Sequence, residues 1–268
     1  MNERYLRVAE LLVRVAPAVF HDGRMALKGG TALNLFLRDM PRLSVDLDLT
    51  FLDGTRPRAE ALACIAEDLR MAAQRLNAAG FRARVLAVGV GDELRMAVRA
   101  QDLEVKVEVN QILRGTLHPV RHMRLVETAR RVLRADVTLP VLHADELYAG
   151  KLAAAMDRQH PRDLFDIAEL NAHGGIGAGL RRCFVAYLAC HNRPLHEVLF
   201  AREKDIALAF EREFSGMTVS AVTLDSLLDV RSRLLRELPH SLDEDERNFL
   251  RSLVRAEPDY ALLGFANL

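Results

Sequence analysis

Polar and apolar residues alternate with a period of two along residues 45–51. The apolar side comprises Val45, Leu47, Leu49 and Phe51, and the other side comprises Asp46, Asp48 and Thr50. Because side chains alternate between the faces of a strand, this pattern predicts a half-buried strand with both carboxylates on its exposed face. Residues 103–110 alternate in the same way, with Glu104, Lys106, Glu108 and Asn110 on one side. We expect a second strand there, with a matching polar face.

Other segments keep helical spacing, in which apolar residues recur every three or four positions. The expected helices are residues 3–20, 32–37, 58–79, 144–158, 161–171, 177–191, 201–213, 221–238 and 242–255. Two further strands are expected at 81–90 and 93–100, with a turn at Gly91-Asp92, and Thr31 is expected to cap the helix at 32–37. The pattern predicts an α+β domain at residues 1–142, with a mixed or antiparallel sheet, and a helical domain at residues 143–268.

Composition and charge narrow the functional classes. The 268 residues include 37 basic and 37 acidic side chains, and this balance argues against a globally basic nucleic-acid binder. The sequence contains no run of 18 apolar residues and no signal-peptide pattern, and its three cysteines form no CxxC pair. We therefore expect a cytoplasmic protein with no membrane partner. Only four basic residues are lysines, namely Lys28, Lys106, Lys151 and Lys204.

The two aspartates of the first strand are candidate metal ligands. Asp46 and Asp48 lie on one face of the strand, about 6–7 Å apart along the backbone. Carboxylates this close repel each other unless a cation lies between them, and Mg²⁺ prefers oxygen ligands of this kind. Glu108 is the candidate third carboxylate if the two strands are neighbours, although Glu104 shares its face. The alternative interpretation is a solvated sheet face with ordinary acidic residues.

A glycine pair precedes this strand in the sequence Lys28-Gly29-Gly30-Thr31. Glycines allow the backbone to approach a phosphate, and the N–H groups at the start of a helix point towards it. The four residues are therefore candidate nucleotide ligands, together with Ser44 beside the aspartates. The alternative is an ordinary turn before a helix.

The helical half contains a second candidate segment. Lys151 lies among small residues that leave room for a ligand, and Asp163 and Asp166 occupy neighbouring positions on one face of the next helix. A helical hairpin with surface salt bridges is the alternative. Residues 114–134 form a basic run that is a weak candidate for RNA binding: Arg114, Arg121, Arg124, Arg130, Arg131 and Arg134. Two smaller basic groups are further candidates for a surface that binds RNA phosphates: Arg181 with Arg182, and Arg231, Arg233 and Arg236.

The motifs LKGGTAL, RLSVDLDL, EVKVEV, ELYAGKLAA and RDLFDIAEL occur in this order over residues 27–170. In combination they resemble the AbiEii/AbiGii family, also called MenT-like toxins, within the polymerase-β-like nucleotidyltransferase superfamily. The resemblance implies an enzyme that binds an NTP with Mg²⁺, transfers its nucleotidyl group to the 3′ end of tRNA and releases pyrophosphate. It also implies a toxin–antitoxin or abortive-infection system, with a winged-helix antitoxin as partner.

The resemblance also implies roles for the candidate residues. Gly29, Gly30 and Ser44 contact the triphosphate, with Lys28 and Thr31 nearby. Asp46 and Asp48 hold the metal, and Glu108 stands where the family often has Asp. The helical half contributes Lys151, which neutralises the leaving pyrophosphate, and Asp166, which orients Lys151 or contacts the nucleotide.

Two other functions remain open on the sequence. One is a nucleotidyltransferase that modifies a protein hydroxyl or a small molecule, because the catalytic strand serves the donor and not the acceptor. The other is a catalytically inert protein of the same fold that binds a partner. The sequence also leaves open which NTP is used, how many nucleotides are added, which tRNAs are modified and how an antitoxin acts.

Overall fold

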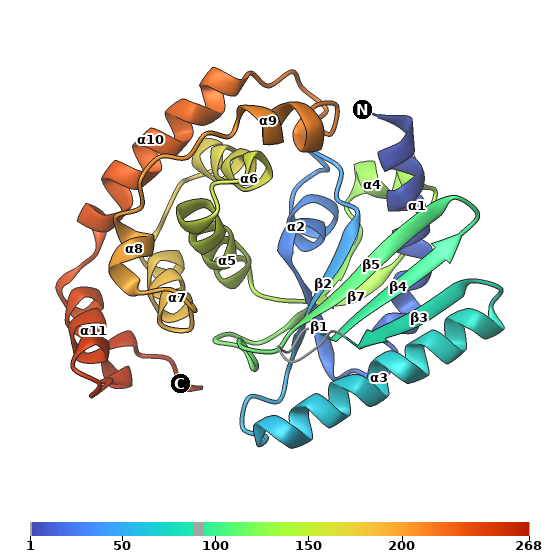
Figure 1. The fold of residues 1–268 in the computed structure, drawn as a ribbon, viewed down its shortest axis with the longest axis horizontal. Coiled ribbons are helices and arrows are strands. Elements are labelled where there is room, and N and C mark those ends of the chain that lie inside the picture. Colours follow the sequence, from blue (N-terminus) through green and yellow to red (C-terminus); the bar gives the residue numbers. More distant parts are fainter. Residues whose placement is uncertain (1, 88–93, 268) are drawn as a thin grey trace. The chain divides into compact units, whose positions relative to one another are not determined.

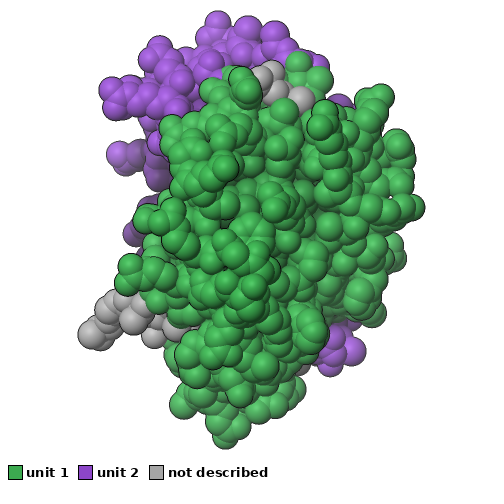
Figure 2. Space-filling view, turned by 90° about the vertical axis from the view of Figure 1, so that its right-hand side faces the viewer, with its two compact units in different colours: residues 1–143, 216–219 green, residues 144–215, 220–268 purple. Residues whose placement is uncertain are grey.

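The chain divides into two compact units. The computed structural model describes residues 2–87 and 94–267, and the expected turn at Gly91-Asp92 lies outside them. Unit 1 comprises Met1–His143 with Gly216–Val219, and unit 2 comprises Ala144–Ser215 with Ser220–Leu268. Figure 2 shows the two units in different colours. The sequence pattern did not predict that the chain returns to unit 1 after residue 215.

Unit 1 is built on a mixed sheet, which confirms the predicted α+β class. Its seven strands among the described residues have the order β3-β4-β5-β2-β1-β7-β6. Their bounds are β1 Met25–Lys28, β2 Asp46–Phe51, β3 Arg82–Ala87, β4 Leu94–Ala100, β5 Leu103–Asn110, β6 Arg121–Arg124 and β7 Thr138–Val141. The pairs β2–β5 and β1–β7 are parallel and the others antiparallel. The predicted strands β2 and β5 are therefore direct neighbours.

Helices α1 (Glu3–Val19) and α3 (Arg58–Ala78) contact each other and the sheet, as Figure 1 shows. The apolar positions of β2 and β5 are fully buried, namely Leu47, Leu49, Val105 and Val107. A shorter helix, α4, spans Glu127–Leu133. The burial of one sheet face leaves the acidic residues of β2 on the other, half-exposed face.

The helix after β1 begins earlier than the sequence predicts. Helix α2 covers Gly29–Thr31 and continues as η1, a π-helical segment at Ala32–Leu37. The predicted N-cap at Thr31 is wrong, because Thr31 has helical dihedral angles and Lys28 occupies the cap position. The Thr31 hydroxyl is instead 2.6 Å from the Asp46 carbonyl oxygen, to which it donates, and 2.9 Å from Ser44 Oγ.

All secondary-structure elements of unit 2 among the described residues are helices. Its elements are α5 Ala144–Asp157, α6 Pro161–Ala172, α7 Ala178–Ala189, α8 Leu195–Leu199, α9 Ala207–Ala209, η2 Phe210–Phe214, α10 Leu224–Ser241, α11 Glu244–Val254 and η3 Tyr260–Leu263. Helix α5 contacts α6, α7, α8 and α10, and so lies at the centre of the unit. No helix in the described part of the chain has the length and apolar character that a membrane span requires.

The predicted helix at residues 201–213 is wrong in its first half, since helical structure begins only at Ala207. The fully buried amide of Gln159 explains this. Its Nε2 donates to the Arg202 carbonyl at 2.8 Å, and its Oε1 accepts from the Lys204 backbone N–H at 3.0 Å. These bonds hold the segment in a non-helical conformation.

The returning segment Gly216–Val219 lies beside residues 41–43. The Leu43 backbone N–H donates to the Met217 carbonyl at 2.9 Å, and the Val219 N–H donates to the Pro41 carbonyl at 3.0 Å. The side chain of Met217 is buried. Four residues from late in the sequence thus complete the part of unit 1 that leads into β2.

Candidate active site

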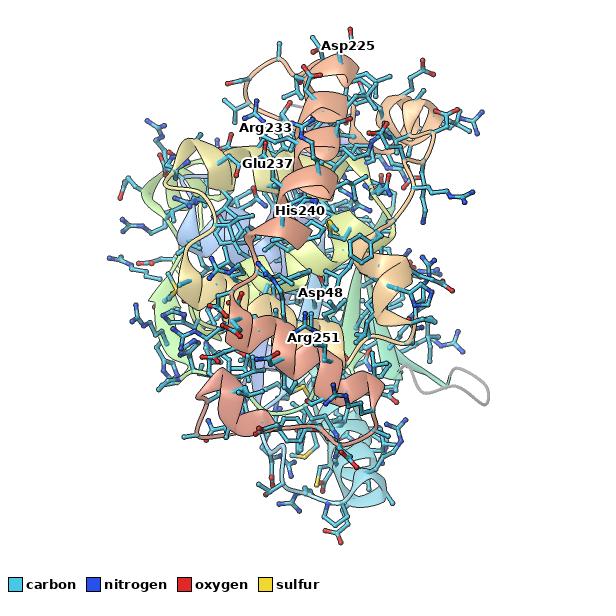
Figure 3. All side chains as sticks on the ribbon, turned by 90° about the vertical axis from the view of Figure 1, so that its left-hand side faces the viewer. Asp48, Asp225, Arg233, Glu237, His240 and Arg251 are labelled. Carbon is cyan, nitrogen blue, oxygen red and sulfur yellow. The ribbon has the colours of Figure 1, made fainter. Side chains whose placement is uncertain are left out.

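A row of charged residues crosses four neighbouring strands of unit 1. Lys28 on β1 is paired with Asp48 on β2, Asp48 with Glu108 on β5, and Glu108 with Arg95 on β4. Paired residues in a sheet project to the same face. Two acidic residues therefore lie next to each other between two basic ones, and Arg95 Nε is 3.2 Å from Glu108 Oε1. Figure 3 labels Asp48 in this row.

The strand register separates the two candidates for the third carboxylate. Asp46 is the first residue of β2 and is paired with Lys106, so Glu104 lies beyond the start of β2. Glu104 forms an ion pair with Arg99. Glu108 is therefore the acid that the sheet places beside Asp48.

The two glycines of α2 allow side chains of the candidate site to approach the backbone closely. A Cβ atom on Gly29 would lie 2.9 Å from Cγ of Asp48 and closer still to Oδ2. A Cβ on Gly30 would lie 2.8 Å from Arg42 Nη2 and 3.0 Å from Ser44 Oγ. Gly29 also has a φ of +71°, which favours glycine. Both glycines are thus required for the packing around Asp48 and Ser44.

If the site catalyses the nucleotidyl transfer that the family resemblance implies, Gly29→Ala is expected to lower the transfer rate by about 10²-fold or more, because the new methyl group displaces the Asp48 carboxylate. Gly23→Ala is the matched control, since Gly23 has a similar φ of +68° but nothing within 4 Å of an added Cβ. Both variants carry the cost of a positive φ, about 1–2 kcal/mol. Transfer assays and thermal melts of the two proteins measure both effects. Equal transfer by the two variants would contradict a specific effect at Asp48.

Arg42 lies beside the glycine pair, a position that the sequence pattern did not predict. Arg42 is almost fully buried, and its Nη1 donates to the Leu43 carbonyl at 2.9 Å. Its Nη2 faces Gly30. The sequence signal for this position was the place of Arg42 as the first residue of the motif RLSVDLDL. The signal was weak, because arginine side chains are usually exposed and the sequence contains many arginines. Arg42 therefore places a positive charge beside Gly30 of α2.

The candidate residues of unit 2 form a buried ion-pair network. Lys151 Nζ is 2.9 Å from Asp163 Oδ1 and 3.0 Å from Asp166 Oδ2. Asp163 also accepts from Arg158, at 2.6 Å from Nε and 3.0 Å from Nη2. Lys151, Asp163 and Asp166 are all buried. The interpretation as surface salt bridges is therefore wrong for these three residues, and Asp163 is the additional acid that holds Lys151.

The network changes the acidity of Asp163. Burial alone would raise the pKa of this carboxyl, but the charge of Lys151 and the hydrogen bond from Arg158 outweigh it and hold the pKa well below its usual range. A carboxyl with a folded-state pKa below the unfolded value stabilises the fold above the unfolded pKa, about 4. This contribution is lost as the pH falls towards the folded-state pKa.

Lowering the pH from about 5 to 2.5 is therefore expected to reduce the free energy of unfolding more steeply in the natural protein than in Asp163→Asn. Urea unfolding at a series of pH values measures both slopes. Asp102→Asn is the control, since Asp102 pairs with Arg7 at the surface and its side chain is 66% exposed. Parallel curves for the natural protein and Asp163→Asn would contradict the assignment.

The basic run at residues 114–134 is partly neutralised. Arg124 pairs with Asp136, and Arg130 pairs with Glu127. Arg114 donates to the Arg56 carbonyl at 2.9 Å. The other three arginines of the run have no ion pair among the described residues: Arg121, Arg131 and Arg134. A neutral carbonyl does not cancel the charge of a guanidinium group, so Arg114 and these three arginines carry the positive charge of the run that remains available.

The smaller basic groups of unit 2 are only partly on the surface. Arg231 is buried and pairs with Glu203, while Arg181 pairs with Glu246 and Asp243. Figure 3 shows Arg233 on α10, where it is exposed. The prediction that Arg181 and Arg231 belong to a free basic surface is wrong, because both are used in packing.

The carboxylates of unit 1 are of the kind that binds a divalent cation, although in the described part of the chain Asp46, Asp48 and Glu108 do not converge as three ligand atoms within 4.8 Å of one another. Asp46 and Asp48 offer carboxylate oxygens on one half-exposed face, and Asp48 and Glu108 lie on paired positions, where like charges repel in the absence of a cation. The absence of a Cβ on Gly29 makes room for the Asp48 carboxylate. Arg95 balances part of the charge of Glu108.

A solved structure with a similar fold is available for comparison. MenT4, a nucleotidyltransferase toxin from Mycobacterium tuberculosis H37Rv, matches with a TM-score of 0.67 and 21% sequence identity, over 96% of this chain and 92% of that chain. The sequence itself matches the family "Nucleotidyl transferase AbiEii toxin, Type IV TA system" over residues 10–266. A search of curated proteins found no match.

The chain therefore belongs to the AbiEii family of nucleotidyltransferase toxins, from type IV toxin–antitoxin systems. This confirms the resemblance inferred from the five motifs, the predicted fold class and the prediction of a nucleotidyltransferase. Membership of the family implies an NTP substrate and an antitoxin partner.

Proposed function

We propose that this protein transfers a nucleotidyl group from an NTP to the 3′ end of tRNA, with Mg²⁺, and thereby blocks translation. The observation that carries the donor half of the proposal is the position of Asp48 beside Glu108 and against Gly29. Such a face holds a metal-bound triphosphate next to backbone N–H groups. The tRNA acceptor rests on the family resemblance.

Asp46 and Asp48 are the proposed Mg²⁺ ligands, and Glu108 is the proposed third carboxylate. The bound metal would neutralise the triphosphate and favour attack of a ribose hydroxyl on the α-phosphorus, with release of pyrophosphate. Gly29, Gly30 and Ser44 contact the phosphates. Lys28 and Arg42 supply positive charge beside this loop. Thr31 supports it through the hydrogen bond to the Asp46 carbonyl.

From the family resemblance, we assign Lys151 to the leaving pyrophosphate, where its ammonium group neutralises developing negative charge. Asp163 and Asp166 fix the position of this lysine through their ion pairs with it. Arg114, Arg121, Arg131 and Arg134 are proposed contacts to RNA phosphates. We also propose that the protein acts in the cytoplasm and that its antitoxin has a winged-helix segment.

Glu108→Gln is expected to reduce transfer by about 10–100-fold, because it removes a carboxylate charge beside Asp48. Glu104→Gln is the matched control, since Glu104 lies on the same face of β5 and is also ion-paired. Initial rates at saturating NTP over a Mg²⁺ titration measure the effect. A larger loss in Glu104→Gln than in Glu108→Gln would reverse the assignment of the third carboxylate.

The proposed reaction is tested by incubating the protein with each α-labelled NTP, Mg²⁺ and either total RNA or total protein. The expected result is label at the 3′ end of tRNA, which periodate oxidation of the acceptor ribose prevents. Label in protein or in a small molecule would replace the proposed acceptor. No label in any acceptor would contradict the proposal.

A further inference from the structure

Unit 2 contains an apolar groove of about 670 Å³ between α8 and α11. This volume is within the range of about 300–1,000 Å³ that is usual for ligand pockets. The floor consists mainly of aliphatic side chains, including Leu195, Leu199, Leu250 and Leu253. Two large apolar residues at the groove are highly exposed: Phe200 at 68% and Val254 at 78%. Exposed apolar residues around a groove are typical of an interaction surface.

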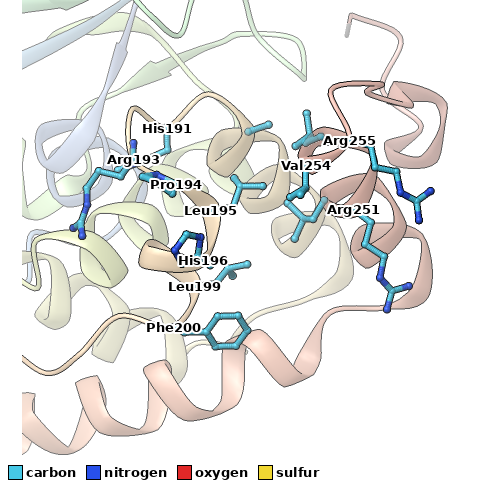
Figure 4. A pocket seen from close by; sticks show the side chains of 13 residues that line it. His191, Arg193, Pro194, Leu195, His196, Leu199, Phe200, Arg251, Val254 and Arg255 are labelled. Carbon is cyan, nitrogen blue, oxygen red and sulfur yellow. The ribbon is translucent and has the colours of Figure 1, made fainter.

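The charge around the groove has one sign. None of the described residues that line it is acidic, and its polar members are His191, Arg193, His196, Arg251 and Arg255. Figure 4 shows His191 and Arg193 on one side of the groove and Arg251 and Arg255 on the other. Arg193 is neutralised by Asp157 and Glu197. Arg251 bonds only to the neutral Asn248 among the described residues, and Arg255 forms no ion pair with them.

Helix α11 presents this apolar and basic surface in two adjacent stripes. Leu250, Leu253 and Val254 follow the spacing of one helical face, and Arg251 and Arg255 are four residues apart on the neighbouring face. The chain's own C-terminal segment covers a different part of the helix, where the Phe249 and Tyr260 rings are 5.8 Å apart. The groove is therefore not the docking position of η3.

We propose that this groove binds a short amphipathic helix of a partner protein. Its aliphatic side chains, spaced three or four residues apart, fill the groove between α8 and α11. Its Asp or Glu residues pair with Arg251 and Arg255. The charges of the two partners are complementary. The acidic side chains of the helix face Arg251 and Arg255, which have no ion pair among the described residues, and they meet no acidic residue in the described lining.

The same residues favour a protein segment over RNA. Single-stranded RNA is bound by several aromatic side chains, on which bases stack, and by a series of cations that follow the phosphates. This groove has one large aromatic ring, Phe200, beside the imidazoles of His191 and His196, and the rest of its apolar lining is mainly aliphatic. Aliphatic anchors of a helix match this floor better than planar bases do.

The test uses a phage-displayed library of random 12-residue peptides, selected on the immobilised full chain. Enriched peptides are expected to combine Leu, Ile or Phe at a spacing of three or four residues with Asp or Glu. Their affinities are then measured by fluorescence anisotropy. Val254→Asp and the double variant Arg251→Glu/Arg255→Glu are each expected to weaken binding by at least about tenfold. Because these side chains are exposed, the substitutions leave the core intact.

Charge reversal provides a sharper test. Lys in place of the acidic residues of the peptide is expected to restore binding to the double variant. Arg236→Glu is the matched control, since Arg236 is an exposed cation on α10 outside the groove, and it leaves peptide affinity unchanged. All variants are expected to transfer nucleotides at the natural rate.

Three results would overturn the proposal. The first is a selection that enriches no peptide, or only peptides without acidic residues. The second is equal peptide binding by the natural protein and Val254→Asp. The third is a labelled RNA 12-mer of random sequence that competes for the groove and loses affinity in Val254→Asp, which would identify the groove as an RNA site.

Discussion

Asp46→Ala is expected to lower the rate of nucleotidyl transfer by about 10³-fold or more. The reason is local, because the substitution removes one of the two carboxylates that β2 presents on its half-exposed face. The side chain of Asp46 is not part of the apolar core, so the fold is expected to survive. Single-turnover assays with labelled NTP measure the loss, and circular dichroism with thermal melting measures the fold.

Asp102→Ala is the control for Asp46→Ala. It also removes one aspartate from unit 1, but from an exposed pair with Arg7. Its transfer rate is expected to equal that of the natural protein. An Asp46→Ala protein that transfers nucleotides within about tenfold of the natural rate would remove this residue from the proposed mechanism.

Asp163→Ala is expected to destabilise the protein by about 3–5 kcal/mol. Asp163 is fully buried and accepts hydrogen bonds from both Lys151 and Arg158. Its removal leaves the buried Lys151 ammonium with Asp166 as its acidic partner in the network. Urea unfolding at neutral pH measures the change in the free energy of unfolding.

The control for this prediction is a salt bridge at the surface. Asp136→Ala breaks the exposed pair with Arg124 and is expected to cost about 0–1 kcal/mol. Asp163→Asn keeps the shape of the side chain, and its loss in the free energy of unfolding is expected to lie between those of Asp163→Ala and Asp136→Ala. Equal stabilities of Asp163→Ala and Asp136→Ala would show that the buried network contributes little to folding.

The two strands that carry the candidate metal ligands, β2 and β5, were predictable from the sequence, because each buries only one face. Alternation along residues 103–110 is a direct consequence of Val105 and Val107 facing the core. The strands β1, β6 and β7 contain four residues each, too few for a periodic signal. Their positions depend on pairing with distant strands.

The parts of the site that the sequence did not predict depend on contacts between distant residues. Lys28 was a candidate nucleotide ligand, but its place at one end of the charged row, with Arg95 at the other, results from strand pairing, which periodicity does not reveal. The buried position of Arg42 results from packing against Gly30. The local spacing did predict that Asp163 and Asp166 share a helix face, but not that both pair with a buried lysine.

Helical propensity also led to a wrong prediction at residues 201–206, where the buried Gln159 side chain forms hydrogen bonds with the backbone in place of those of a helix. Residues 201–206 contain no glycine or proline, and their sequence is compatible with a helix. The Gln159 amide binds the backbone at Arg202 and Lys204 and prevents it. Such a bond between residues more than 40 positions apart has no local signature in the sequence.

The return of the chain at Gly216–Val219 has a consequence for recombination between related toxin genes. A gene fragment that ends after codon 143 encodes unit 1 without Met217 and without the hydrogen bonds to Pro41 and Leu43. Exchange of a complete helical unit therefore needs crossovers on both sides of codons 216–219 in addition to the one near codon 143. Recombination should therefore produce folded chimaeras of this protein less often than of a protein whose two domains are joined by a single linker.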